Sequence, residues 1–289
     1  MPRLLANLLT QAEGGGVALG LDLPFGLPRE YVARHVREAD FLSFLRGLTH
    51  RPDFFRVCAT LDQVSGARPF YPLRNGPGMT RAAHAAALGL AAATSFARTC
   101  DRATRDRQAG SPLFWTLGPQ QVGKAVLAAW GDLVLPALAA EPCPVRLWPF
   151  EGDFRALLAP ERIVIAETYP AEALRHLGAR FGGSKRRQSD RARFADALLG
   201  AMDALRAMPD AALAAQVACG FGADAAGEDR FDTVLGVLCV LNVLAGRRPD
   251  AVPDDPWVRR WEGWVLGQAA PETTSAECPS ASGTRSDVR

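Results

Sequence analysis

Apolar residues form short runs that alternate with longer segments of helical spacing. Two of these runs, 17–23 (VALGLDL) and 162–168 (RIVIAET), are short, contain a single acid each, and are closed by a proline. Because proline cannot donate to a strand ladder, each pattern predicts a buried β-strand that ends there. A further short strand is predicted at 145–148. Such strands among helices predict an α/β fold.

Helical spacing of the apolar residues predicts the longer elements. The predicted helices cover 2–12, 29–47, 80–100, 122–140, 171–177, two segments within 184–217, and 231–244. Prolines and glycines crowd residues 50–80, which predicts a long excursion over the surface. From Ala269 onward the chain is rich in Ser, Thr, Pro and Glu. We therefore expect a single domain over 1–268 and a disordered polar tail over 269–289.

Composition and charge narrow the class of protein. The 289 residues are 48% hydrophobic, as in globular domains, and the formal net charge is only +2. Any contact with nucleic acid must therefore come from a local basic patch. The six cysteines form no C-x-x-C pair, which fits a reducing cytosol. The longest apolar run, 234–245, is too short to span a bilayer, and the first residues lack a signal-peptide cleavage site. We expect a cytoplasmic protein with no membrane association and no evident protein partner.

Three acids stand where the apolar pattern does not require one. Asp22 and Glu167 lie near the carboxyl ends of the two predicted strands, and Asp232 lies in the first turn of the predicted helix 231–244. An ionised carboxylate in an apolar strand is costly unless something pairs with it. The carboxyl ends of strands in an open α/β sheet also border the usual ligand crevice. Because hard cations such as Mg²⁺ take oxygen ligands, the three acids together predict a metal site.

Each acid also has a purely structural explanation. Asp232 could complement the dipole of its helix. Asp22 could accept backbone N–H bonds in the turn after its strand, and Glu167 could pair with an arginine. For one acid alone the structural explanation is the more common, whereas the combination of three favours a site.

Two basic clusters could contact a phosphate backbone. One contains Lys185, Arg186, Arg187, Arg191 and Arg193, and the other contains Arg98, Arg102, Arg105 and Arg107. A solvated helix face is the more common explanation for clusters of this kind.

Residues 118–124 (GPQQVGK) nearly match a phosphate-binding P-loop. Ala125 stands where that loop needs Ser or Thr for Mg²⁺, and Pro119 removes one amide from the cradle. Hydrolysis of a nucleoside triphosphate is therefore a minor alternative.

Five segments, in order along the chain, carry a resemblance to a known family. They are GLDLPFGLP, VIAETYPAEALRHLG, SKRRQ, GEDRFDTVLGVL and RRWEGWVLG, within residues 1–268. The set resembles the domain of unknown function 429 family, a group of predicted nucleases with a ribonuclease-H-like fold. The resemblance implies a mixed sheet flanked by helices, with large helical insertions. It also implies two Mg²⁺ or Mn²⁺ ions held by Asp22, Glu167 and Asp232, with substrate contacts from Lys185, Arg186, Gln121 and Lys124.

The resemblance is incomplete at the N-terminus. The family fold begins with a meander of three strands, and its first strand carries the first acid. By resemblance, Asp22 falls on the fourth-strand acid, Glu167 on a fifth-strand acid and Asp232 on the late-helix acid. No acid precedes Glu13 in this chain. Either the true start lies upstream of Met1, which we expect, or the first acid and three strands are missing and a sheet edge is exposed.

We therefore expect a metal-dependent phosphodiesterase that acts on nucleic acid, with the carboxylates holding the ions. The alternative is a non-catalytic protein that binds nucleic acid or another ligand and keeps the fold without the first acid. No recognition motif selects DNA, RNA or a small phosphate ester as the substrate.

Overall fold

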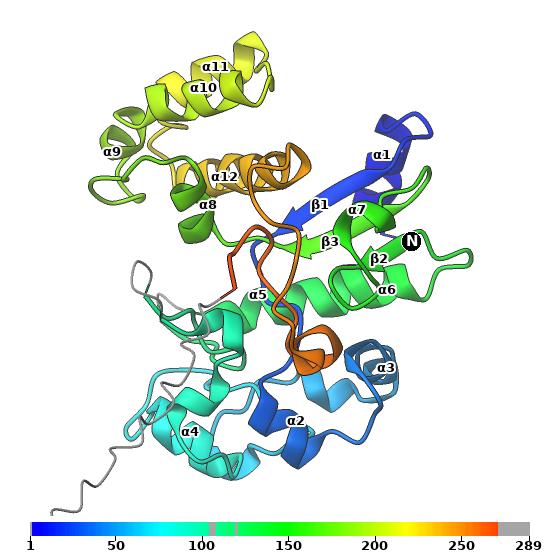
Figure 1. Ribbon diagram of the computed structural model, residues 1–289. Coiled ribbons are helices and arrows are strands. Elements are labelled where there is room, and N and C mark those ends of the chain that lie inside the picture. Colours follow the sequence, from blue (N-terminus) through cyan, green and yellow to red (C-terminus); the bar gives the residue numbers. More distant parts are fainter. Residues whose placement is uncertain (1, 104–107, 119–120, 271–289) are drawn as a thin grey trace, which may run out of the picture.

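A small parallel sheet lies at the centre of the molecule (Figure 1). The computed structural model describes residues 2–103, 108–118 and 121–270. Strands β1 (Val17–Leu21), β3 (Ile163–Glu167) and β2 (Val145–Leu147) lie side by side in that order, and both pairs are parallel. The three predicted strands and the α/β class are thus confirmed. The described strands are all parallel, whereas the resemblance implied a mixed sheet.

Helices make up much of the remaining described chain. In order they are α1 (Arg3–Gln11), α2 (Arg29–His35), α3 (Phe41–Gly47), α4 (Arg81–Ala87), α5 (Val122–Ala128), α6 (Leu135–Leu138), α7 (Phe154–Leu157), α8 (Pro170–His176), α9 (Gln188–Ala192), α10 (Ala195–Ala204), α11 (Ala211–Ala218) and α12 (Ala226–Leu244). A π-helical turn joins α5 to α6, and another spans Val258–Glu262. No helix among the described residues is both long enough and apolar enough to cross a membrane.

The predicted helix over 29–47 is two helices, α2 and α3. Val36 takes an extended conformation directly after α2 and ends it. Asp40 then starts α3, because its carboxylate accepts a hydrogen bond from the amide of Ser43 at 2.7 Å. Local capping therefore divides a segment whose apolar spacing is continuous.

Other predicted elements also differ from the structure. The helix predicted over 80–100 ends at Ala87, close to Gly89, whose φ of +67° is outside the helical range. Residues 184–217 hold three helices rather than two. The segment 50–80, predicted as an excursion over the surface, is exposed at many positions, but Phe70 anchors it to the core because this side chain is fully buried and packs edge-on against Phe114.

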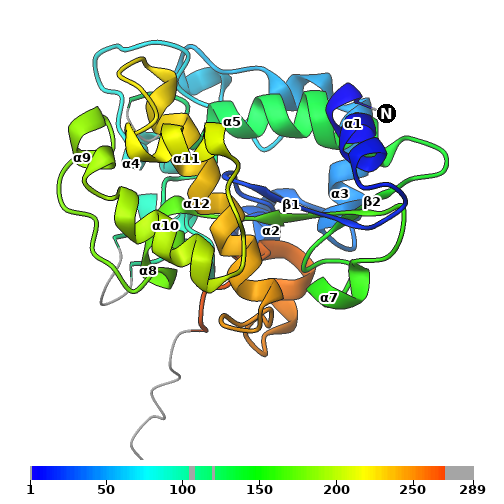
Figure 2. The ribbon, with the colours of Figure 1, turned by 90° about the horizontal axis from the view of Figure 1, so that it is seen from above.

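The sheet lies between two layers of helices (Figure 2). Side chains alternate across a strand, so Val17, Leu19 and Leu21 of β1 pack into the core that includes residues of α1 and α5. Ala18 and Gly20 face the opposite layer, where a side chain on Gly20 would touch Val240 of α12. Both faces of β1 are therefore covered by helices.

Candidate functional site

The carboxyl ends of β1 and β3 bring two of the predicted acids to one edge of the sheet. Leu21 pairs with Glu167, and Asp22 follows Leu21 directly. Asp22 and Glu167 both line a cavity of about 60 Å³. Helix α12 packs on β1 and brings Asp232 to the same end, where Asp22 and Asp232 line a larger groove of about 780 Å³. Asp22 therefore lines both the cavity, together with Glu167, and the groove, together with Asp232.

Asp22 has no hydrogen-bond partner among the described residues, so the alternative in which turn amides satisfy it is not supported. Desolvation by the surrounding atoms raises the pKa of Asp22 to about 7. The negative charges of Asp232 and Glu167 also raise it, and the ammonium of Lys185 opposes them. Asp22 is exposed at the mouth of the groove, so water screens part of this effect. The carboxyl group can thus gain or lose a proton near neutral pH.

Asp232 lies in the second turn of α12, because the helix begins at Ala226 rather than at Phe231. The field of a helix dipole fades within the first turn, so the dipole does not explain this acid. Instead, the Nζ atom of Lys185 donates to both carboxylate oxygens at 2.7 Å. Desolvation raises the pKa of Asp232, and the ammonium of Lys185 opposes that shift. The charge of Asp232 is therefore balanced by the ammonium of Lys185.

Glu167 is held by a buried arginine. The guanidinium of Arg98, only 1% exposed, donates to both Glu167 oxygens at 2.6 and 2.7 Å. The amide of Phe25 donates to the same carboxylate at 3.0 Å. The structural explanation for Glu167, a pairing with an arginine, is therefore confirmed. Arg98 was predicted as part of a phosphate-binding cluster, and this interpretation is wrong because its side chain is buried in the interior.

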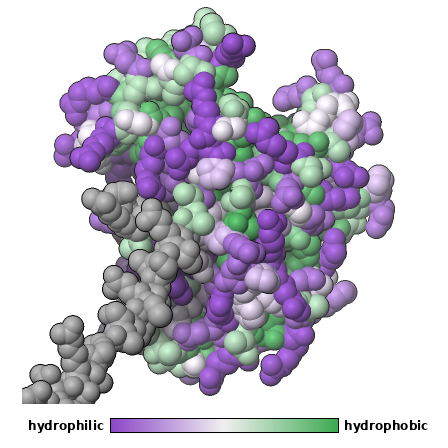
Figure 3. Space-filling model, viewed as in Figure 1, coloured by the Kyte–Doolittle hydropathy of each residue, from purple (hydrophilic) through white to green (hydrophobic). Residues whose placement is uncertain are grey.

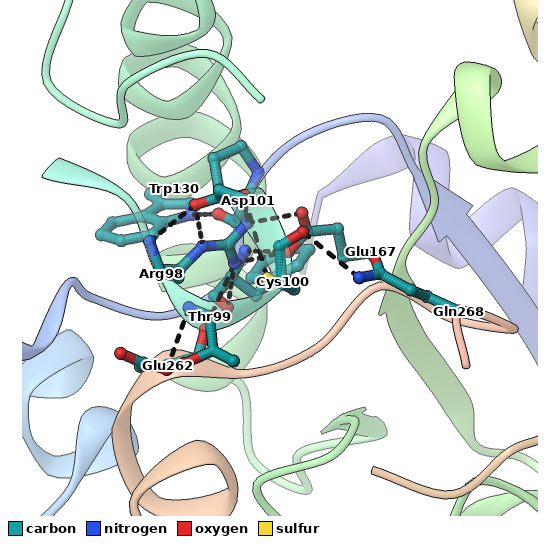
Figure 4. A network of polar contacts seen from close by, with 10 residues as sticks. Arg98, Thr99, Cys100, Asp101, Trp130, Glu167, Glu262 and Gln268 are labelled. Atoms are coloured by element: carbon teal, nitrogen blue, oxygen red, sulfur yellow. Dashed lines mark hydrogen bonds and ion pairs between the residues drawn. The ribbon is translucent and has the colours of Figure 1, made fainter. Parts of the chain in front are cut away.

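The same guanidinium joins segments that are far apart in the sequence (Figure 4). Arg98 donates to both oxygens of Asp101 at 2.8 and 2.9 Å and to the backbone carbonyl of Glu262 at 3.3 Å. The Glu262 carboxylate accepts a bond from the amide of Thr99 at 3.1 Å. The network ties the end of β3 to the segment around Arg98 and to the last described segment of the chain.

Cys100, Asp101 and Glu167 form a group that could hold a metal ion, with one ligand atom of each within 4.8 Å of the others. Cys100 and Asp101 were not among the predicted site residues. The only sequence signal for them was the spacing of Arg98 and Asp101, which suits an ion pair. The guanidinium of Arg98 already supplies positive charge to both carboxylates of this group. A cation placed there would compete with Arg98, which argues against a metal at this group.

The four residues predicted to contact the substrate do not line a common cavity or groove. Lys185 is bound to Asp232, and the exposed Arg186 lies 3.9 Å from Glu228. Gln121 and Lys124 are exposed at the start of α5, where Val122 between them lines the smaller cavity.

Other residues of the two predicted basic clusters bind groups within the protein or lie outside the described residues. Arg191 is buried, and its guanidinium binds the carbonyls of Gly220 and Gly222 at 2.9 and 2.6 Å. Arg105 and Arg107 lie outside the described residues.

Two amides of the P-loop-like segment, those of Gly123 and Lys124, already donate to backbone carbonyls. The amide of Gly123 donates to the carbonyl of Trp115 at 3.0 Å, and a Cβ on Gly123 would lie 2.7 Å from that oxygen. Pro119 and Gln120 lie outside the described residues. Gly123 therefore serves the close packing of α5 on Trp115, and the nucleotide alternative receives no support.

Comparison of the chain with protein-family models, with curated proteins and with solved structures found no match. The family resemblance therefore remains a hypothesis that rests on the sequence segments alone.

Proposed function

We propose that this chain hydrolyses phosphodiester bonds with the help of Mg²⁺ or Mn²⁺, and that Asp22 and Asp232 hold the cation. One observation carries the proposal. Two carboxylates from different elements border the same groove, and the charge of Asp232 contributes to a pKa of about 7 at Asp22. Perturbed acids that converge in a cleft are characteristic of functional sites. A divalent cation between them would turn this repulsion into attraction.

The donor set fits a hard cation. Asp22 and Asp232 offer carboxylate oxygens, which Mg²⁺ and Mn²⁺ prefer. Asp22 is exposed, so an ion can reach it from solvent. The ammonium of Lys185 contacts both oxygens of Asp232, and an ion has to compete with it. Glu167 does not belong to this metal set, because Arg98 donates to both of its carboxylate oxygens.

Asp22 and Lys185 would then have different roles in the reaction. A bound cation supplies a Lewis acid for a phosphoryl oxygen. Asp22 has to be ionised to bind the cation, so it releases a proton on binding. Lys185, once it has left Asp232, can pair with the charge of a phosphate. Nucleic acid as the substrate and a second ion rest on the family resemblance.

Calorimetric titration with Mn²⁺ tests the cation site without a choice of substrate. The parent should bind Mn²⁺ saturably, and both Asp22→Asn and Asp232→Asn should abolish the binding. Asp53→Asn is the matched control, because Asp53 is also paired with a cation, Arg56, but is 65% exposed and belongs to another part of the chain. A folded parent that binds no Mn²⁺ would refute the proposal.

A specific observation also favours the non-catalytic alternative. Arg98 and Lys185 already neutralise Glu167 and Asp232, so the fold itself supplies the cations of two of the three acids. A protein that binds a ligand without cleaving it could keep this arrangement. Labelled single- and double-stranded DNA and RNA, incubated with the chain and Mn²⁺, separate the two: Mn²⁺ binding with cleavage supports the hydrolase, and Mn²⁺ binding without cleavage of any substrate supports the binding protein.

A further inference from the structure

The chain enters the interior directly after Asp22. The face of the molecule seen in Figure 3 is largely hydrophilic, with apolar atoms in small patches. Asp22 is exposed, whereas each of the residues 23–28 that follow it is buried. The conformation of this buried turn, residues 23–28, therefore determines where the Asp22 side chain lies.

Asp22 depends on such support because nothing holds its carboxylate directly. The carboxylate has no hydrogen-bond partner in the described part of the chain. The negative charges of Asp232 and Glu167 act on it, and like charges repel each other. On the preceding side, the carbonyl of Leu21 accepts a bond from the amide of Thr168 at 2.9 Å. The restraint on the following side has to come from the buried turn.

Side chains from distant segments hold the backbone of the buried turn. The indole Nε1 of Trp130 donates to the carbonyl of Pro24 at 3.2 Å. The Glu167 carboxylate accepts a bond from the amide of Phe25 at 3.0 Å, and the guanidinium of Arg98 donates to the carbonyl of the same residue at 2.8 Å. Figure 4 shows Trp130 alongside the contacts of Arg98 and Glu167. Three backbone groups of two consecutive residues are thus fixed by three side chains.

Trp130 differs from the other two side chains because it is neutral. Glu167 and Arg98 bring charge to the cavity of about 60 Å³ that Asp22 also lines. Trp130 lines neither this cavity nor the groove, and its fully buried ring packs edge-on against Phe41 of α3. Its indole N–H therefore affects Asp22 through the buried turn and not through charge.

The helix that carries Trp130 is adapted to direct its side chain inward. Val126, Trp130 and Val134 follow one another at a spacing of four and are all buried. Residues four apart in an α-helix are rotated by about 40° from each other. Trp130 lies in the π-helical turn Ala129–Val134, which takes more residues per turn and so keeps such residues closer to one face. Turns of this kind are frequent at functional sites.

We propose that Trp130 is a positioning residue, which fixes the buried turn and thereby holds the Asp22 carboxylate beside Asp232. That Asp22 then meets a cation rests on the proposed function, whereas the fixing of the turn does not. Without the indole N–H, the carbonyl of Pro24 would lose its partner in the interior, where an unmade hydrogen bond is costly. The turn would then open locally and let Asp22 move away from Asp232.

Hydrogen exchange of the whole chain, followed by NMR, measures the opening of the turn. Trp130→Phe keeps an aromatic ring and removes the indole N–H. The Phe25 amide should then exchange at least about fivefold faster relative to the amides of β3, which report general opening. Calorimetry should show that Mn²⁺ binds about 10- to 100-fold more weakly, as for other residues that orient a metal ligand.

Trp264→Phe is the matched control. Trp264 is also buried, and its Nε1 donates to the carbonyl of Gln268 at 2.9 Å, so the variant loses a bond of the same kind. This bond does not involve the buried turn. The relative exchange of Phe25 and the affinity for Mn²⁺ should therefore match those of the parent, although the variant melts at a lower temperature.

Three results would overturn the proposal. The first is an unchanged relative exchange of Phe25 in Trp130→Phe. The second is an equal acceleration in Trp264→Phe. The third is faster exchange in Trp130→Phe with unchanged affinity for Mn²⁺, since the turn would then not position Asp22.

Two further outcomes keep this proposal separate from the proposed function. If the parent binds no Mn²⁺, the proposed function fails, and the exchange of Phe25 alone decides on Trp130. If Trp130→Phe does not fold, the parent decides. Its Trp130 indole N–H should be protected from exchange to the same degree as the Phe25 amide, and an indole that exchanges freely would overturn the proposal.

Discussion

Replacing Arg98 with methionine removes the cation that holds Glu167. Arg98 is 1% exposed, and its guanidinium contacts the carboxylates of Glu167 and Asp101 and the carbonyl of Phe25. Methionine has no charge, so both carboxylates lose this partner. Breaking a buried pair costs about 3–5 kcal/mol of unfolding free energy. At about 2–4 °C per kcal/mol for a domain near this size, the melting temperature should fall by roughly 6–20 °C.

Thermal denaturation followed by circular dichroism measures this loss. Arg56→Met is the matched control. Arg56 pairs with Asp53 at 3.0 Å, with the same three-residue spacing as Arg98 and Asp101, but the Arg56 side chain is 67% exposed. Exposed pairs contribute about 0–1 kcal/mol, so the control should melt within about 4 °C of the parent. If Arg98→Met loses no more than Arg56→Met, the buried network does not stabilise the fold as reasoned.

A double variant shows whether the stability belongs to the pair. Glu167→Gln keeps the shape of the side chain and removes its charge. If Arg98 and Glu167 act together, the loss in Arg98→Met combined with Glu167→Gln should be smaller than the sum of the single losses, by about 0.5–3 kcal/mol. Additive losses would mean that Arg98 stabilises the fold mainly through Asp101 and the backbone carbonyls.

Two further predictions concern the acids beside the groove. The pKa of Asp22 is about 7 in the folded chain, against an ordinary value of 3.8. Between these two pH values the folded chain therefore holds a proton that the unfolded chain has lost. The stability that this proton contributes declines as the pH rises through the same window. Melting temperatures between pH 4 and pH 8 should show this decline in the parent and its loss in Asp22→Asn, and an identical pH profile in both would contradict the shift. Lys185→Met removes the ammonium that competes at Asp232, so Mn²⁺ should bind more tightly by calorimetry at pH 8. Arg186→Met, at an exposed neighbouring position, should leave the affinity unchanged, and weaker binding in Lys185→Met would count against competition.

The strands could be predicted from the sequence because their signal is local. Each is a short apolar run closed by a proline, and the position of Asp22 and Glu167 at strand ends follows from the same runs. That both acids lie at one edge follows from the parallel pairing of β1 with β3. The helices were predicted too long where a single residue changes the backbone, as Asp40 does by capping α3 and Gly89 does after α4.

The partners of the acids could not be predicted, because they are distant in the sequence. Arg98 lies 69 residues before Glu167, and Lys185 lies 47 residues before Asp232. Nothing in the pattern around Arg98 distinguishes it from Arg102, the exposed arginine of the same predicted cluster. The sequence therefore showed that Glu167 needs a cation or a proton, and only the fold shows which side chain supplies it.

The network around Arg98 also affects the order in which the molecule can be completed during synthesis. Val265 pairs with Glu167, the amide of Leu266 donates to the Glu167 carbonyl at 2.8 Å, and Arg98 reaches the carbonyl of Glu262. A chain leaves the ribosome from its N-terminus, so β1 and β3 can pair while these last residues are still in the exit tunnel. The edge that carries the acids is consequently completed after the sheet has formed. In a nascent chain stalled before Glu262, Glu167 and Arg98 would lack the contacts that the last segment makes with them.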